Sequence, residues 1–569
     1  ILPNDDVVFD IYKVNGKSET LLKTINLTGT EIRKKGLGKD ITNKALKGLP
    51  GLQKEGGDGL IVSAKFVLYS PFKYCKTICL EFFGSNMVAA SQAIIKVNDL
   101  FTKNEDVFLT ALEHFDEKYV DAINYRNKSP RNEMPKAVLL IDLESNNQAA
   151  LNIGCEEIIN LITKFNAEGI IANDEAERKI FWNDRKHLGA IAKHTNAFKL
   201  NEDIVIPLIN LPDFADYIEQ LNYIKEFENA IAAIDKINNY LTGILSSESE
   251  DIPNKRIEGI ISYLKNKKDE YKELIKGIDL NPDILKNLQN GIIKYSYAEE
   301  ITSYYKKVLH GYDKIINNIS LVENAERTRR IIIATHMHAG DGNVHVNIPV
   351  HSNDYLMMTE ADEAAAKAMK KAVELGGVVS GEHGIGLTKL KFIDQSILDE
   401  YQEYKKINDP DDLFNPGKLN SNFPLYLIYT PSFNLLEREA IILEYTDLEK
   451  LSSQISSCVR CGKCKSVCNT HYPTGNMLYN PRNKILAVGA ITEAVLFAAQ
   501  TLDMKSFEYF KNLIEISDNC TVCHKCSIPC PVKIDFGDVS INIRKQLEFR
   551  KKSKLKLFTA IALFYLGRK

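Results

Sequence analysis

Hydrophobic and polar positions change their spacing several times along the chain, and each change marks a predicted region. Between residues 75 and 215, short apolar runs alternate with segments in which apolar residues recur every three or four positions. The runs KTICLEFFG (76–84) and KAVLLIDLE (136–144) predict strands, whereas residues 85–101 and 156–166 predict helices. This alternation predicts an α+β layout, with helices on one face of a sheet.

Further along the chain the pattern turns helical and then returns to strands. Residues 216–325 carry Ile, Leu and Tyr at a spacing of three to four, which predicts a helical insertion whose aromatic residues form its own core. The strand-like segment RRIIIATHMHAGDGNVHVNIPV (329–350) follows, and a helix is predicted over Thr359–Glu374. Near the start of the chain, glycines punctuate short β-like runs, and the alternation from Leu60 to Tyr69 predicts a strand.

Composition narrows the class of protein. A chain of 569 residues can form two or three domains, and 44% hydrophobic with 26% charged residues is usual for a globular protein. The net charge of −3 gives no reason to expect nucleic acid as a partner. No apolar run reaches the roughly 18 residues of a membrane-spanning helix. The basic and apolar tail, residues 551–569, allows either a peripheral membrane contact or a packed terminal helix.

Eight of the eleven cysteines form two runs near the end of the chain with the same spacing, C-x-x-C-x-x-C-x-x-x-C. The runs are Cys458, Cys461, Cys464 and Cys468, and Cys520, Cys523, Cys526 and Cys530. Three thiolates at steps of three can hold one face of a 4Fe–4S cluster, and the fourth commonly comes from beside the other cluster. We therefore expect two 4Fe–4S clusters, with zinc or disulfides as the alternatives, and a reducing compartment such as the cytoplasm.

A second group of candidate ligands lies in two glycine-rich segments. These segments contain His336, His338, Asp341, Asn343 and His345, and then Glu382 and His383. Two imidazoles and one carboxylate suit a divalent ion such as Zn²⁺ or Mn²⁺ with positions left open for a substrate. A free imidazole at His383 could then remove a proton from a carbinol. The alternative is that these histidines only bond to the backbone of a glycine-rich turn.

Three motifs in a fixed order carry a family resemblance: HAGDGNVHVN (338–347), SGEHGIG (380–386) and FNPGKLN (414–420). They resemble the C-terminal domain of FAD-linked oxidases of the vanillyl-alcohol oxidase type. The branch with this set acts on D-2-hydroxy acids and includes D-lactate, D-2-hydroxyglutarate and glycolate oxidising enzymes. KEGGDGLIV (54–62) resembles a segment late in their FAD-binding domain, and the cysteine runs resemble a ferredoxin-like domain fused to the same oxidases.

The resemblance implies a role for each matching residue. His338 and His345 correspond to metal-binding histidines, Glu382 to the metal carboxylate and His383 to the catalytic base. Arg185 and Lys199 resemble the residues that hold the substrate carboxylate, although the spacing after Lys199 departs from the family pattern. The flavin-contacting positions that the resemblance implies are Glu55, Gly56, Gly59 and Asn415.

The resemblance also divides the chain. We expect the end of a FAD-binding domain over 1–70, a cap domain over 71–420 with its helical insertion at about 216–325, a two-cluster domain over 436–550, and the tail 551–569. The glycine-rich pyrophosphate loop of the family is not found in this sequence. It is therefore expected upstream in a longer chain or on another chain.

The function implied is a FAD-dependent D-2-hydroxy-acid dehydrogenase, with D-lactate as the first substrate to consider. Electrons would pass from the flavin through two 4Fe–4S clusters to a quinone, a cytochrome or a protein acceptor. The expected location is the cytoplasm, or the inner face of the membrane as a peripheral protein. The alternative is a non-catalytic electron-transfer subunit that docks a separate flavoprotein.

Overall fold

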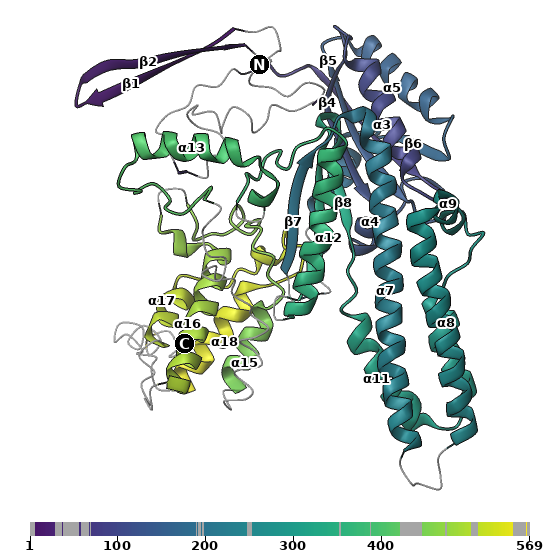
Figure 1. The fold of residues 1–569 in the computed structure, drawn as a ribbon. Coiled ribbons are helices and arrows are strands. Elements are labelled where there is room, and N and C mark those ends of the chain that lie inside the picture. The colour runs from purple at the N-terminus through teal and green to yellow at the C-terminus, as the bar shows by residue number, and fades with distance from the viewer. Residues whose placement is uncertain are drawn as a thin grey trace. The chain divides into compact units, whose positions relative to one another are not determined.

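A computed structural model places most of the chain in two compact units (Figure 1). The first unit comprises Ile1–Lys186, Leu200–Ile348 and Thr359–Ile428, and the second comprises His187–Lys199, Pro349–Met358 and Tyr429–Lys569. The structure describes residues 6–28, 37, 56–57, 68, 70–188, 191, 195, 198–246, 253–351, 354–386, 389–420, 446–472, 475–501, 510–549 and 565.

A seven-stranded sheet in the order β6-β3-β5-β4-β8-β9-β7 forms the framework of the first unit. Its strands are β3 (Tyr74–Phe82), β4 (Phe108–Asp116), β5 (Ala137–Ser145), β6 (Ala167–Ile171), β7 (Phe198–Val205), β8 (Ala334–His338) and β9 (Asn343–Val350). Every pairing from β6 through β9 is antiparallel. The interior strands β5 and β9 are buried along nearly their whole length, so both faces of the sheet are covered there.

Helices packed on this sheet include α3 (Val88–Phe101), α4 (Glu117–Ala122), α5 (Gln148–Ile162), α6 (Glu175–Lys186) and α12 (Tyr355–Glu374). The α+β layout predicted from the sequence is therefore confirmed. Helix α5 begins at Gln148 and not at residue 156, because the Asn147 side chain accepts hydrogen bonds from the backbone N–H groups of Ala149 and Ala150. This cap fixes the start of the helix about two turns earlier than the hydrophobic pattern indicated.

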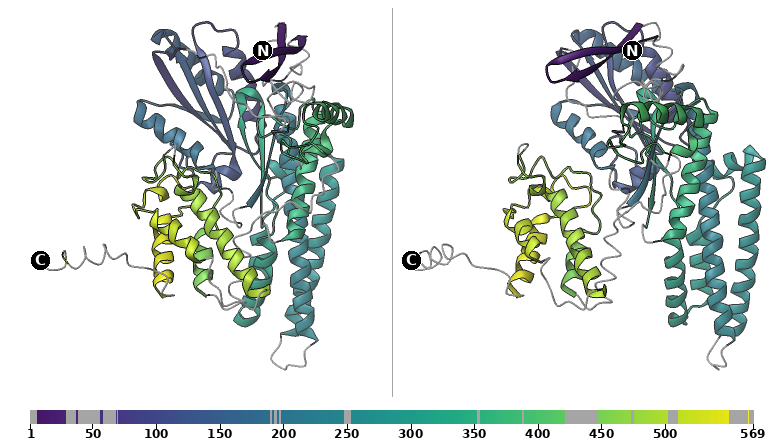
Figure 2. Two further views of the ribbon diagram at one scale, coloured as in Figure 1. Left: turned by 90° about the vertical axis from the view of Figure 1, so that its left-hand side faces the viewer. Right: turned by 60° about the vertical axis from the view of Figure 1, so that its left-hand side comes forward.

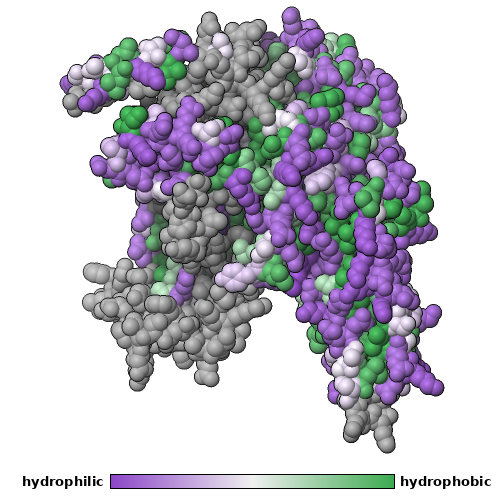
Figure 3. Space-filling model, viewed as in Figure 1, coloured by the Kyte–Doolittle hydropathy of each residue, from purple (hydrophilic) through white to green (hydrophobic). Residues whose placement is uncertain are grey.

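Long helices extend from the sheet and run side by side (Figures 1 and 2). They are α7 (Leu211–Leu245), α8 (Asn254–Leu280), α9 (Pro282–Gln289) and α11 (Asp313–Arg327), with the shorter η3 (Ala298–Thr302) and α10 (Ser303–Val308). Phe227, Tyr271 and Tyr305 are fully buried among these helices, so the aromatic residues of the insertion do form its own core, as predicted. Hydrophilic side chains cover much of the visible face of this bundle (Figure 3).

Four helices make up the described part of the cysteine-rich region in the second unit: α15 (Thr446–Ile455), α16 (Pro481–Thr501), α17 (Phe510–Asp518) and α18 (Phe536–Phe549). They enclose a small core that includes Leu451, Val488, Leu513 and Ile543. The cysteines lie in the segments that connect these helices. The prediction of a small helical iron–sulfur domain agrees with this architecture.

The ends of the chain are described only in part. Strands β1 (Asp6–Asn15) and β2 (Ser18–Thr28) form an antiparallel hairpin, and Gly16 at its turn has φ +64°. Of the strand predicted over 60–69, only Leu68 lies among the described residues, and of the tail 551–569 only Tyr565 does. Within the described ranges, no helix combines the length and apolar character that a membrane span requires.

Candidate functional site

A hairpin of two interior strands of the sheet, β8 and β9, positions the two predicted histidine ligands. Strand β8 ends at His338, β9 begins at Asn343, and the register pairs His336 with His345. Gly342 makes the turn between them with φ +68°, and a Cβ atom at this position would lie 2.2 Å from the carbonyl oxygen of Ile206. The turn therefore requires glycine, and His338 and His345 are held by paired backbone.

The loop with Glu382 and His383 is fastened to the sheet by a buried aspartate. Asp203 on β7 accepts hydrogen bonds through Oδ2 from the backbone N–H groups of Gly381 and Glu382, each at 2.6 Å. The Lys389 ammonium also pairs with the Asp203 carboxylate, and it donates a hydrogen bond to the backbone carbonyl of Asp203 at 2.9 Å. Burial raises the pKa of Asp203, but the Lys389 charge and these hydrogen bonds outweigh it, so the pKa lies below its ordinary value.

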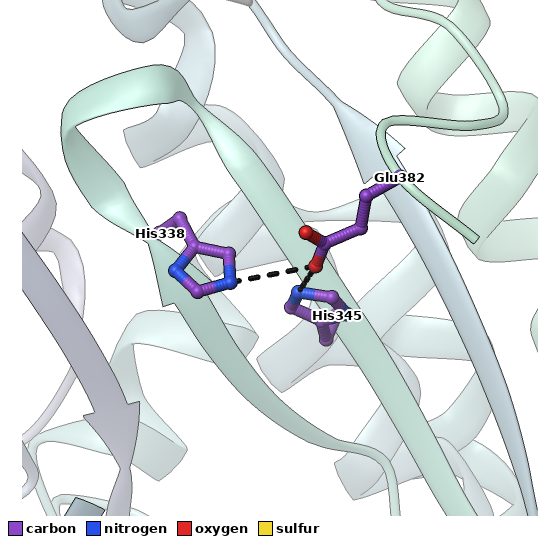
Figure 4. Close-up of side chains that lie close together, drawn as sticks. All are labelled: His338, His345 and Glu382. Carbon is purple, nitrogen blue, oxygen red and sulfur yellow. Dashed lines mark ion pairs between the residues drawn. The ribbon is translucent and has the colours of Figure 1, made fainter. Parts of the chain in front are cut away.

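His338, His345 and Glu382 converge on one point (Figure 4). Their ligand atoms lie within 4.8 Å of one another. Oε1 of Glu382 is 2.8 Å from Nε2 of His345 and 3.4 Å from Nε2 of His338. The carboxylate and the two rings thus come from separate segments and face one another, as three ligands of one ion would.

His345 is the most informative member of this group. It is 3% exposed, and among the described residues neither ring nitrogen makes a well-aligned hydrogen bond, although Nε2 lies 2.8 Å from Oε1 of Glu382. Burial and the neighbouring His383 lower its pKa to about 3, so the ring is neutral and can offer a lone pair. A buried imidazole without a well-aligned hydrogen bond costs free energy unless something else binds it, so this arrangement fits a metal ion.

Glu113 on β4 orients His338 by bonding to the ring nitrogen that does not face Glu382. It accepts a hydrogen bond from Nδ1 of His338 at 2.7 Å, which leaves Nε2 facing Glu382, and its other oxygen pairs with Nε of Arg185 at 2.7 Å. Burial raises the pKa of Glu113, but His338 and Arg185 bring it below its ordinary value, and the same bond raises the pKa of His338. A carboxylate behind a ligating histidine is a common arrangement at metal sites.

Glu113, Asp203 and Lys389 are absent from the residues predicted from the sequence. Glu113 stands in the largely apolar strand sequence FLTALEHFD, and Asp203 stands in FKLNEDIV directly before the apolar residues Ile204 and Val205. An ionisable residue inside a buried strand must have a partner, and this is the signal that points to them.

His383 lies at the open side of the group. Its side chain is 36% exposed, with Nε2 4.0 Å from Oε1 of Glu382 and Nδ1 3.8 Å from Oδ1 of Asp203. An adjoining cavity is lined by Glu113, His338 and Asp341 and by the apolar rings of Phe101 and Phe108. The imidazole of His383 is therefore accessible next to the converging ligands.

The remaining predicted residues are placed less completely. Glu55 and Gly59 lie outside the described residues, whereas Gly56 has φ +69° with open space where a Cβ would stand, and Asn415 has φ +44°. Lys199 lies in β7, four residues before Asp203.

Lys405 draws together the two sequence segments that were predicted to contact flavin. Its ammonium donates to the backbone carbonyls of Gly57 at 2.7 Å and Phe414 at 2.9 Å. The glycine-rich segment and the FNPGKLN segment therefore meet at this buried lysine.

The eight cysteines of the second unit line two neighbouring cavities in a crossed arrangement. Cys458, Cys461, Cys464 and Cys530 line the first cavity, and Cys468, Cys520, Cys523 and Cys526 line the other. Cys526 also reaches the wall of the first cavity. Each set thus takes three cysteines from one run and the last cysteine of the other run, as in two-cluster ferredoxins.

The geometry of the cysteines distinguishes between the alternatives for this module. All eight are free thiols, which excludes disulfides in this structure. Among the described residues, no three cysteine sulfurs lie within 4.8 Å of one another, so each set is more open than the tight tetrahedron around one zinc ion, with Zn–S of about 2.3 Å. Backbone N–H groups of Ile534 and Phe536 point at Sγ of Cys530 and Cys526, each at 3.3 Å. The two sets fit 4Fe–4S clusters.

Comparison with known proteins assigns both parts of the chain. Residues 86–233 and 298–419 match the family described as FAD linked oxidases, C-terminal domain, and residues 454–534 match the 4Fe-4S dicluster domain. The unmatched residues 234–297 contain the end of α7 together with α8 and α9, so the outer part of the helical bundle is an addition to the family domain.

Individual relatives match over shorter stretches. The chain is 32% identical over 110 residues to glycolate oxidase subunit GlcD of Bacillus subtilis, covering 19% of this chain and 23% of the relative. It is 40% identical over 90 residues to GlcD of Escherichia coli K12 (15% and 18%). It is 31% identical over 123 residues to D-lactate dehydrogenase of Archaeoglobus fulgidus (20% and 27%). The matches thus span about a quarter or less of these relatives. The chain joins the C-terminal domain of the FAD linked oxidases to a 4Fe-4S dicluster domain.

Proposed function

We propose that the protein is a FAD-dependent dehydrogenase of D-2-hydroxy acids, with D-lactate as its first candidate substrate. The observation that supports this most strongly is the convergence of His338, His345 and Glu382 beside the accessible imidazole of His383. Relatives of the matched domain are named glycolate oxidase subunit and D-lactate dehydrogenase, and those substrates share a hydroxyl beside a carboxylate.

His338, His345 and Glu382 would hold a divalent ion, Zn²⁺ or Mn²⁺. The buried, neutral ring of His345, which faces Glu382, and the Glu113 carboxylate that bonds to His338 support such a site, because a ligating histidine must be deprotonated and oriented. Glu55, Gly56, Gly59 and Asn415 are the flavin contacts that we propose on this chain. When bound, the ion lowers the pKa of the substrate hydroxyl, the flavin accepts hydride, and the clusters pass electrons on one at a time.

The chain's own side chains then have defined tasks. His383 takes the hydroxyl proton through Nε2, the ring nitrogen that lies toward Glu382. Arg185 uses Nε for its bond to Glu113, and its Nη groups are the donors that we assign to the substrate carboxylate, together with the Lys199 ammonium. Asp203 holds the backbone of the loop so that Glu382 and His383 keep their positions.

The electron acceptor in this proposal is a quinone, a cytochrome or a partner protein that takes single electrons. The crossed cysteine sets share the wall residue Cys526, so the two clusters would be neighbours and exchange electrons readily. A subunit that only docks another flavoprotein would gain nothing from two histidines and a carboxylate that converge on one point, so the enzyme is the better account.

The test is anaerobic reduction of the protein, reconstituted with FAD, iron and sulfide, by a panel of D- and L-2-hydroxy acids. Flavin bleaching and cluster electron paramagnetic resonance (EPR) would be recorded for each acid. We expect D-acids to reduce both kinds of centre and their L-enantiomers to reduce neither. If no 2-hydroxy acid reduces a centre that dithionite does reduce, the proposal is wrong.

A further inference from the structure

A lysine is buried beside the second set of cysteines. Lys484 stands in the first turn of α16 and is 1% exposed, which places it among the largest fully buried side chains of the described chain. It lines the same cavity as Cys468, Cys520, Cys523 and Cys526. Lysine is rarely buried unless a charged or hydrogen-bonded partner compensates it.

The contacts of Lys484 hold its ammonium next to the cysteines. It donates to the backbone carbonyl of Asn519, the residue before Cys520, and to Oγ1 of Thr470 at 3.3 Å. Phe536, itself 1% exposed, lies under the ammonium at 5.8 Å from the ring centre. The charge is therefore fixed in position and shielded from water.

Neutral groups accept these hydrogen bonds, so among the residues that the structure describes, the anions suggested beside Lys484 are the cysteine thiolates. Burial lowers the pKa of Lys484, whereas Cys520, Cys468 and Cys526 raise it. An occupied site keeps those sulfurs as thiolates, and their negative charge favours the ammonium form.

We propose that Lys484 sets the reduction potential of the second cluster by placing a buried positive charge beside it. Reduction adds one electron and one negative charge to the cluster, and no bond forms or breaks. A fixed cation at low dielectric stabilises the reduced form more than the oxidised form, so it raises the potential. This inference rests on the dicluster domain and not on the identity of the substrate.

The first cluster set is surrounded differently. Its cavity is lined by Arg460 and Arg482, neither of which is fully buried. Water screens a partly exposed guanidinium much more than a buried ammonium. The effect of Lys484 should therefore appear on one cluster and leave the other nearly unchanged.

The experiment is a redox titration of the reconstituted protein with dithionite, followed by EPR, on wild type, Lys484→Met and Lys484→Gln. Both variants remove the charge at similar length, and Gln keeps a donor for the Asn519 carbonyl. We expect one midpoint potential to fall by at least about 59 mV, which is a tenfold change for a one-electron couple. Lys484→Arg should stay close to wild type, and so should Lys545→Met, a neutralised exposed lysine on α18.

A Cys523→Ser variant identifies the wave that belongs to the second set, because the substitution changes a ligand of that cavity. Iron and sulfide analysis of each variant accompanies the titration. Unchanged potentials in both neutral variants would overturn the proposal, and so would a shift confined to the other wave. Loss of the second cluster in both neutral variants would also overturn it, because Lys484 would then be required for assembly. None of these outcomes depends on substrate turnover.

Discussion

The histidine site and the cysteine module hold their functional groups in different ways. His338 and His345 belong to a paired hairpin of two interior strands, and Asp203 holds the loop that carries Glu382. The cysteines lie in segments between helices, where Arg460, Val522 and His524 adopt positive φ angles of 56°, 52° and 58°. The histidine site is held by hydrogen bonds within the protein, whereas the cysteines line two cavities between loops.

This difference indicates where each region obtains its stability. The sheet site keeps its shape through buried strands and partnered acids, so an ion bound there would add chemistry to a framework that is already formed. The four helices around the cysteines enclose a much smaller core, and cluster binding can supply folding free energy there.

The largest expected effect is on turnover and not on structure. His383→Ala should lower the rate of 2-hydroxy-acid oxidation by about 10²- to 10⁴-fold, because a positioned base contributes that much. Iron content and the thermal midpoint should stay the same, since the side chain is 36% exposed. Steady-state kinetics and metal analysis check this, with His310→Ala, an exposed histidine of the helical insertion, as the control. Unchanged turnover in His383→Ala would remove this residue as the base.

Removal of the inorganic groups tests the contrast directly. Extraction of the iron should raise the rate of amide hydrogen exchange in α16 and α18 by about 100-fold. These helices would lose the clusters that hold their connecting segments together. Treatment with a chelator that takes only the divalent ion should leave exchange in β8 and β9 unchanged. Equal loss of protection in both regions would mean that the sheet site also depends on its ion for folding.

A smaller effect, on the affinity for the divalent ion, is expected when the Glu113 carboxylate that bonds to His338 is replaced. Glu113→Gln should weaken binding of the divalent ion by about 10- to 100-fold, because the neutral amide orients the imidazole less well and adds no charge. Metal titration followed by calorimetry gives the affinity. Glu168→Gln serves as the control, since Glu168 lies on the outer strand β6 and makes a partly exposed ion pair with Arg131. Equal affinity in wild type and Glu113→Gln would show that Glu113 does not support the site.

Two glycine substitutions give the smallest effects and have opposite signs. A Cβ at Gly381 would lie 2.2 Å from Oδ1 of Asn343, so Gly381→Ala should lower the free energy of unfolding by about 1–3 kcal/mol. Gly259 lies inside helix α8, and a Cβ at this position would meet open space. Gly259→Ala should therefore raise the free energy of unfolding by about 0.5–1 kcal/mol. Chemical denaturation measures both. Stabilisation by Gly381→Ala would show that the loop beside Asp203 is looser than the structure indicates.

More of the cysteine module than of the residues around the histidine site could be predicted from the sequence. The spacing of the cysteines indicated that the fourth ligand of each cluster commonly comes from beside the other cluster. The hydrophobic pattern predicted the segment that contains β8 and β9, but it did not predict β4 and β7, which flank this hairpin in the sheet, and it did not place the start of α5, which depends on the Asn147 side chain.

Tertiary contacts explain what the sequence did not reveal at the histidine site. Glu113 and Asp203 act through partners 225 and 186 residues away, His338 and Lys389. A local pattern can show that an acid stands in a buried strand, but it does not show which distant residue that acid contacts.

The central claim is that one chain couples oxidation at the histidine site to its paired clusters. Rapid freeze-quench EPR after anaerobic mixing with D-lactate tests it most directly, on the protein reconstituted with FAD, iron and sulfide. The account predicts that cluster signals of both sets grow after the flavin bleaches, and that His383→Ala abolishes this growth while dithionite still reduces both clusters. Clusters that stay oxidised in wild type after D-lactate and every other D-2-hydroxy acid tested would contradict the account.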